Sequence, residues 1–154
     1  MPMNSVNDLL AEELRELLDA EKQAGRAYPK LVKAVSSERL KEALDQHNDE
    51  TKGQIERLNQ IFEALDMRAR GKSCEAVRGL IEDAQDFVEK DLAPELLDVA
   101  LIAAAQKMEH FEIAAYGSAR AHAEALGLAK VVRLLEQTLE EEKARALDGE
   151  HESS

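Results

Sequence analysis

Apolar residues recur at alternating intervals of three and four along most of this sequence. In the segment 7–35 they occur at Leu10, Leu14, Leu17, Leu31 and Val35. This spacing places them on one face of an α-helix, and such a face has to be buried against other helices. Similar faces occur in the segments 38–66, 95–125 and 129–147. The sequence therefore predicts an all-α fold with four long helices.

The connections between these four segments differ in length. Ser36-Ser37 joins the first two and Gly127 ends the third, so each pair of segments forms a hairpin with a tight turn. A much longer connection joins the hairpins, and it contains an amphipathic segment at 74–90. A long crossover between two helix hairpins is the topology of a ferritin-like bundle, whereas a simple up-and-down bundle has short loops throughout.

We therefore expect one domain in residues 1–147, a ferritin-like four-helix bundle with a short extra helix in the crossover. Pro94 is suited to the first turn of the third long helix. The polar segment 148–154 is expected to be a disordered tail.

Composition limits the partners and the location. The net charge of −12 opposes binding to nucleic acid, and with no basic tail it argues against a DNA-protecting miniferritin. No apolar run approaches the ~18 residues that a membrane-spanning helix needs. The first ten residues lack the features of a signal peptide, and the single cysteine, Cys74, fits a reducing compartment. We expect a cytoplasmic protein with no nucleic-acid or membrane partner.

Acidic residues interrupt the apolar faces near their midpoints. Glu109 and Glu112 occur in QKMEHFEIAAYG, directly after the nearly uncharged run LLDVALIAAA. Glu21 and Glu142 stand in the apolar faces of the first and fourth helices. A buried carboxylate is expensive unless it is paired or bound to a cation. These positions therefore need a chemical explanation.

The positions of the acids relative to the turns predict that they meet. Glu21 and Glu50 lie about 15 residues on either side of the first turn, and Glu112 and Glu142 lie about as far from the second. At a rise of roughly 1.5 Å per residue, both acidic levels are about 22 Å from their turns. His47 shares a helix face with Glu50, three residues away. The sequence thus predicts one acidic layer across the bundle.

Such a layer is suited to metal ions. Carboxylates this close raise one another's pKa values unless a cation lies between them. Hard oxygen ligands with an imidazole nearby suit iron or manganese, and also zinc. A pair of metal ions is what ferritin-like carboxylate proteins bind. The candidate metal ligands are Glu21, Glu50, Glu109, Glu112, Glu142 and His47.

Each of these residues also has an ordinary interpretation. Glu50 is equally compatible with a solvated helix edge, and Glu109 with Glu112 can form a surface turn facing Lys107. His47 is as compatible with a hydrogen-bonded core histidine as with a ligand. The joint occurrence of the acids at one height favours the layer.

Several segments resemble the YciE/YciF family of bacterial ferritin-like proteins, in the right order over about residues 8–147. They are ELLDAEKQ, HNDETKGQIERLNQIFE, GKSCEAVRGLI, ALIAAAQKMEHFEIAAYGSARAHAEALGL and LLEQTLEEEK. The resemblance implies a four-helix ferritin-like bundle, a homodimer and an association with stress responses.

The sequence departs from the related rubrerythrin and ferritin pattern, in which the second and fourth helices carry Glu-x-x-His. Gly53 lies three residues after Glu50, and Arg145 lies three residues after Glu142. His47 lies one turn before Glu50 instead. The carboxylate half of a di-iron site is therefore present, and the histidine half does not follow the pattern.

Two functions remain open from the sequence. The first is a stress-associated metal-binding protein, with a di-iron carboxylate site that oxidises Fe(II) with oxygen or peroxide. The second is a non-enzymatic structural or interaction protein, in which the acidic layer is vestigial and is protonated or hydrated. Metal content after expression without chelators distinguishes them.

The resemblance and the amphipathic segment 74–90 predict a homodimer, because the apolar face of this segment needs a covering surface. Its own bundle is the alternative cover. Light scattering at micromolar concentration is expected to give about twice the chain mass of 17.1 kDa. A mass equal to one chain would contradict the dimer.

Overall fold

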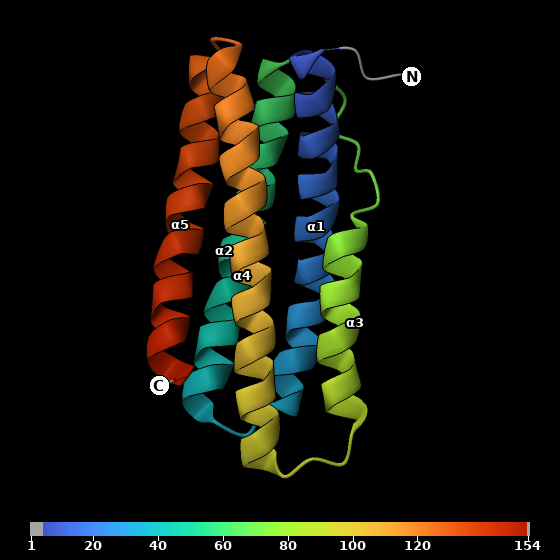
Figure 1. The fold of residues 1–154 in the computed structure, drawn as a ribbon, viewed down its shortest axis with the longest axis vertical. Coiled ribbons are helices and arrows are strands. Elements are labelled where there is room, and N and C mark those ends of the chain that lie inside the picture. Colours follow the sequence, from blue (N-terminus) through green and yellow to red (C-terminus); the bar gives the residue numbers. More distant parts are fainter. Residues whose placement is uncertain (1–4, 154) are drawn as a thin grey trace.

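The computed structural model describes residues 5–153, with their side chains as far as residue 147. Its helices are α1 (Val6–Ala34), α2 (Glu38–Ala64), α3 (Glu75–Glu89), α4 (Pro94–Ala125) and α5 (Ala129–Ser153), and residues 5–153 contain no β-strand. The long helices α1, α2, α4 and α5 form a bundle, and α3 lies on its outside against α1 and α4 (Figure 1). The predicted all-α bundle of two hairpins with a short crossover helix is confirmed.

The crossover decides the directions of the helices. After α2, the chain returns along the length of the bundle through α3, so α2 and α4 run in the same direction (Figure 1). Among the four long helices, the main contacting pairs are α1–α2, α4–α5, α1–α4 and α2–α5, and each of these pairs is antiparallel. A single long crossover between two hairpins gives this arrangement in ferritin-like folds.

The predicted signals set the ends of the helices. The backbone N–H of Leu40 donates a hydrogen bond of 3.2 Å to the Ser37 hydroxyl, which caps α2. Gly127 has a φ of 70° in the α4–α5 turn, a left-handed conformation that glycine adopts without strain. Pro94 begins α4, as expected. The backbone of α5 is helical to Ser153, six residues beyond the predicted end, and the disorder of 148–154 stays a prediction.

Two apolar clusters lie at opposite ends of the bundle. One is built around Leu10, Leu14, Leu58, Phe62 and Leu135, and the other around Tyr28, Leu31, Leu40, Leu44 and Leu101. Buried polar side chains from all four long helices occupy the middle of the bundle, between these two clusters. They are Glu21, His47, Thr51, Gln54, Glu109, Glu112 and Glu142. The core is therefore apolar at both ends and polar at mid-height.

The apolar face of α3 packs on its own chain. Val77 and Cys74 are buried against Ala20 of α1 and Met108 of α4. The apolar face of this segment is therefore covered by its own bundle, which was the alternative to a dimer partner. The dimer stays a prediction that depends on the family resemblance.

None of the helices in the described residues is long and apolar enough to span a membrane.

One carboxylate of α4 fixes the α1–α2 turn. Asp98 accepts hydrogen bonds from the backbone N–H of Ser36 at 2.9 Å, from its hydroxyl at 2.7 Å and from the backbone N–H of Ser37 at 3.0 Å. These bonds satisfy donors of the turn and join the two hairpins. The height of the α1–α2 hairpin relative to α4 is thereby constrained.

We predict that Asp98→Ala lowers the free energy of unfolding by about 2 kcal/mol, because turn donors that lose their acceptor cost roughly 1–3 kcal/mol. The measurement is urea denaturation of parent and variant. Lys107→Ala, an exposed change on the same helix, is the control and should leave the unfolding midpoint nearly unchanged. Equal midpoints for Asp98→Ala and the parent would contradict this role.

Candidate metal centre

Three carboxyl groups from three helices meet in the middle of the bundle. Glu21 of α1, Glu112 of α4 and Glu142 of α5 have exposed fractions of 0%, 1% and 0%. The Glu112 carboxyl group is within hydrogen-bonding reach of both of the others. As ionised groups they only accept, and neither oxygen of Glu21 or of Glu112 has a donor among the described residues. The group therefore needs protons or a cation.

The surroundings of these groups favour protons. Burial raises the pKa of Glu21 from 4.5 to about 7 and the pKa of Glu142 to about 8. The pKa of Glu112 is raised well above its usual range by burial, and further by the neighbouring charges of Glu21 and Glu142. In the metal-free protein near neutral pH, the three groups hold at least part of their protons. A shared proton then lets Glu112 and Glu21 hydrogen-bond each other.

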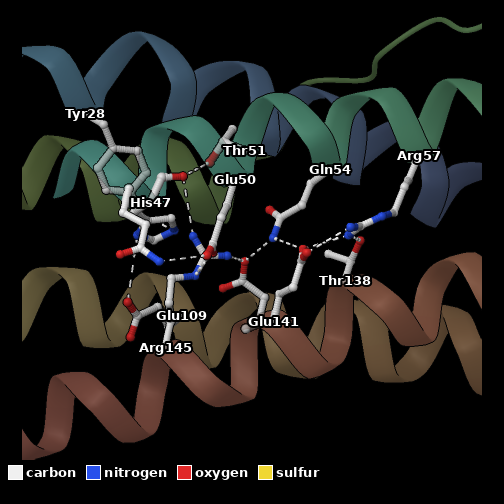
Figure 2. Close-up of polar contacts among 12 residues, drawn as sticks. Tyr28, His47, Glu50, Thr51, Gln54, Arg57, Glu109, Thr138, Glu141 and Arg145 are labelled. Atoms are coloured by element: carbon white, nitrogen blue, oxygen red, sulfur yellow. Dashed lines mark hydrogen bonds and ion pairs between the residues drawn. The ribbon is translucent and has the colours of Figure 1, made fainter. Parts of the chain in front are cut away.

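A guanidinium group enters the layer from α5. Arg145 pairs with the Glu142 carboxylate, and its Nε lies 3.1 Å from an oxygen of Glu50 on α2 (Figure 2). It also donates to the backbone carbonyl of His47 at 3.5 Å. Burial lowers the pKa of Arg145 to about 10, so this group remains charged at neutral pH. The layer thus contains its own cation.

His47 lies between Tyr28 and Glu109. Its Nε2 shares a hydrogen bond of 3.1 Å with the Tyr28 hydroxyl, and its Nδ1 lies 3.8 Å from an oxygen of Glu109 (Figure 2). The histidine is buried, and one of its nitrogens already has a partner. The interpretation as a hydrogen-bonded core histidine describes this geometry, and a role as a metal ligand stays a prediction.

A polar network continues from the layer along the α2–α5 interface. The Gln54 amide donates to Glu142 at 2.9 Å and to Glu141 at 3.2 Å. Arg57 binds both oxygens of Glu141, at 2.6 and 2.8 Å (Figure 2). Hydrogen bonding to Arg57 holds the pKa of Glu141 below its usual range. The Arg57–Glu141 pair is part-exposed, so the network extends from the dry layer to the surface.

The predicted site residues lie in one region of the bundle, but their side chains differ in how far they are exposed to solvent. Glu109 and Glu112 are both buried, so their interpretation as a surface turn is wrong. Glu50 retains 27% side-chain exposure and is paired with Arg145, which places it at the edge of the layer. Among the described side chains, no group of three or more His, Cys, Asp or Glu residues is arranged to hold a metal ion.

The donor set nevertheless fits a cation on one side. The Glu21 and Glu112 oxygens are buried acceptors without donors, which suits a hard divalent ion after side-chain rotation. On the Glu142 side, Arg145 occupies the position three residues along, where ferritin-like sites carry a histidine. In the sequence, Arg145 is visible only as a departure from the Glu-x-x-His pattern. Its spacing of one helical turn from Glu142 was the signal that could have placed it in the layer.

These features define a class of protein: an antiparallel four-helix bundle with one long crossover and a buried carboxylate layer at mid-height. Residues 5–148 match the sequence family described as a domain of unknown function, DUF892. The chain belongs to this family. Protein YciF of Escherichia coli is 46% identical over 145 residues, which cover 94% of this chain and 87% of that protein.

Solved structures agree with this assignment. The crystal structure described as the E. coli stress protein YciF matches with a TM-score of 0.94 and 43% identity, over 98% of this chain and 96% of that one. YcfI from Rhodopseudomonas palustris, described as a candidate structural protein, matches with a TM-score of 0.93 and 39% identity, over 96% and 94% of the two chains. The resemblance to the YciE/YciF family is confirmed.

The raised pKa values predict how the stability of the metal-free protein depends on pH. From the ordinary pKa of 4.5 up to about 7 or 8, the native state keeps protons that the unfolded chain has released. Stability therefore falls as pH rises through this window, because stability falls wherever the native state binds more protons. The expected loss between pH 5 and 8 is a few kcal/mol, at about 1.4 kcal/mol per unit of pKa difference.

Urea denaturation at pH 5, 6, 7 and 8 in the presence of a chelator tests this dependence. Glu112→Gln should flatten the curve, since the amide cannot ionise. Glu140→Gln, a change at an exposed residue of the same bundle, should keep the parental slope. A parental stability that is constant or rises over this range would show that the layer does not hold its protons.

Proposed function

We propose that this protein binds a divalent metal ion in its carboxylate layer, in exchange for protons. The observation that carries the proposal is the pair Glu21 and Glu112, whose four buried oxygens have no donor among the described residues. A dry, negatively charged acceptor set costs stability unless it takes up a cation or protons. Carboxylate oxygens suit a hard divalent ion, which would replace the protons that these groups otherwise hold.

The residues that would hold the ion come from three helices. Glu21, Glu112 and Glu142 would supply the oxygens, with Glu109, Glu50 and His47 as further candidate ligands. Iron suits this donor set, and two iron ions are the family-based expectation; manganese and zinc are the alternatives. If the metal is iron, the chemistry it would supply is its own oxidation from Fe(II) to Fe(III), with oxygen or peroxide as the electron acceptor.

The chain itself would supply a dry and adjustable environment. The apolar clusters on either side of the layer exclude water from the carboxylates. Glu21 and Glu112 would release protons as a cation enters, because their pKa values fall when a positive charge approaches. The side chains would have to rotate, since the described residues form no ready-made metal group. These movements would leave the helical backbones in place.

A second function is favoured by a different observation. Arg145 already pairs with Glu142 and Glu50, so the layer is partly neutralised without metal. In that case the bundle would be a non-enzymatic structural or interaction protein, with the remaining acids protonated. One relative is described as a candidate structural protein. A homodimer, a cytoplasmic location and a part in stress responses are compatible with both functions, and we propose them on the family resemblance.

Metal content separates the two functions. The protein is produced in medium containing iron, manganese and zinc, purified without chelators, and analysed by plasma mass spectrometry. Anaerobic titration of the metal-free protein with Fe(II), Mn(II) and Zn(II) then gives the affinity for each ion. Metal-free protein that takes up none of the three would favour the structural function.

The variant Glu112→Leu tests the site through stability. In the presence of a chelator it should melt at or above the parent, because a buried carboxyl is replaced by an apolar side chain of similar size. Fe(II) should stabilise the parent, by about 2.7 kcal/mol at one hundred times the dissociation constant. The same addition should have little effect on the variant. Thermal melting under nitrogen measures both.

Glu140→Leu, on the exposed side of α5, is the matched control and should keep the parental response to Fe(II). If Glu112→Leu loses stability in chelator and the parent responds to no divalent metal, Glu112 is a structural residue. The metal assignment would then be wrong.

A further inference from the structure

The guanidinium of Arg145 stands where a cation is needed. It pairs with the fully buried Glu142 and with Glu50, and its side chain is only 12% exposed. A guanidinium is planar and permanently charged, and its several donors can serve two carboxylates at once. Arg57 also lies at the α2–α5 interface, where it is engaged by Glu141. Arg145 is therefore the positive charge in direct contact with the layer.

The positive charge is unevenly distributed across the layer. The Glu142 oxygen that faces α2 receives donors from Arg145 and from the Gln54 amide. The four oxygens of Glu21 and Glu112, on α1 and α4, receive none from the described residues. One side of the layer is thus supplied with a cation by the chain, and the other side lacks one.

We propose that Arg145 fills one of two cation positions in the layer, so that removing its guanidinium adds one divalent ion to the number that the chain binds. The parent then holds a single ion, on the side of Glu21 and Glu112. This inference deepens the proposed function and rests on it for the parent's own ion.

The repulsion between charges supports this assignment. A divalent ion bound to Glu142 beside the guanidinium would meet like charge at short range in a poorly solvated region, where Coulomb interactions are strong. The ligand pattern agrees, because two-ion sites of ferritin-like proteins use a histidine three residues after a glutamate on two helices. Here those two positions are Gly53 and Arg145. Neither position carries a histidine, and at one of them a fixed cation stands beside Glu142.

The test counts ions in three proteins. The parent, Arg145→Gln and Arg57→Gln are dialysed to equilibrium against Fe(II) under nitrogen, and bound iron is measured per chain. We expect one ion in the parent, two in Arg145→Gln and one in Arg57→Gln. Arg57→Gln is the matched control, because it removes a guanidinium from the same interface and leaves the layer intact.

The outcomes separate this inference from the proposed function. No ion in the parent and one in Arg145→Gln would overturn metal binding by the parent and would support the role of Arg145. Equal numbers in the parent and Arg145→Gln would overturn the role of Arg145, whatever the number is. An added ion in Arg57→Gln as well would overturn it too, since any loss of positive charge would then suffice.

Failure of Arg145→Gln to fold without metal is also informative. If the guanidinium stands in for an ion, Fe(II) should restore the helical circular dichroism of the unfolded variant, and Arg145→Lys should fold without metal and keep the parental ion count. A variant that stays unfolded at every Fe(II) concentration, or a lysine variant that gains an ion, would overturn the inference.

Discussion

The fold depends on how negative charge is kept inside a dry helical bundle. Three helices bring buried carboxylates to mid-height, and α2 adds Glu50 at the edge of the layer. The interior on either side of the layer is apolar. Isolated charges are not stable there. Protons on Glu21 and Glu112, the guanidinium of Arg145 and the amide of Gln54 together keep the layer compatible with folding. Binding of a metal ion in this layer would have to displace one or more of these neutralising groups.

The rest of the structure holds this layer in register. The rise per residue of a helix is fixed, so tight turns at equal distances from the acids bring them to one level. Asp98 fixes the α1–α2 turn to α4, and Gly127 allows the sharp α4–α5 turn. The apolar clusters at the two ends supply the burial that stabilises the bundle. Their burial offsets the cost of the polar layer in the middle.

These same rules explain what the sequence could predict. Helix length and turn position gave the meeting of Glu21, Glu112 and Glu142, because both follow from a regular backbone. The rotation of α2 about its axis depends on packing, which is why Glu50 could be assigned only to a margin and His47 to two alternatives. Arg145 escaped prediction for another reason. A long arginine side chain on a bundle helix ordinarily extends to water, and its inward course depends on the carboxylates that other helices supply.

Because the Arg145 side chain points into the bundle, the layer has two chemically different sides, one at Glu142 and one at Glu21 and Glu112. Glu21 and Glu112 hold protons, which a bound metal ion would displace. Arg145 cannot be neutralised by losing its proton under ordinary conditions, since even the burial-lowered pKa is about 10. Removing it from Glu142 would require moving a charged side chain outward along the α2–α5 interface, where Glu50 already holds it. Loss of a proton would break no ion pair, whereas displacement of Arg145 would break its ion pairs with Glu50 and Glu142. The two sides of the layer therefore differ because protons neutralise Glu21 and Glu112, whereas an arginine of α5 neutralises Glu142.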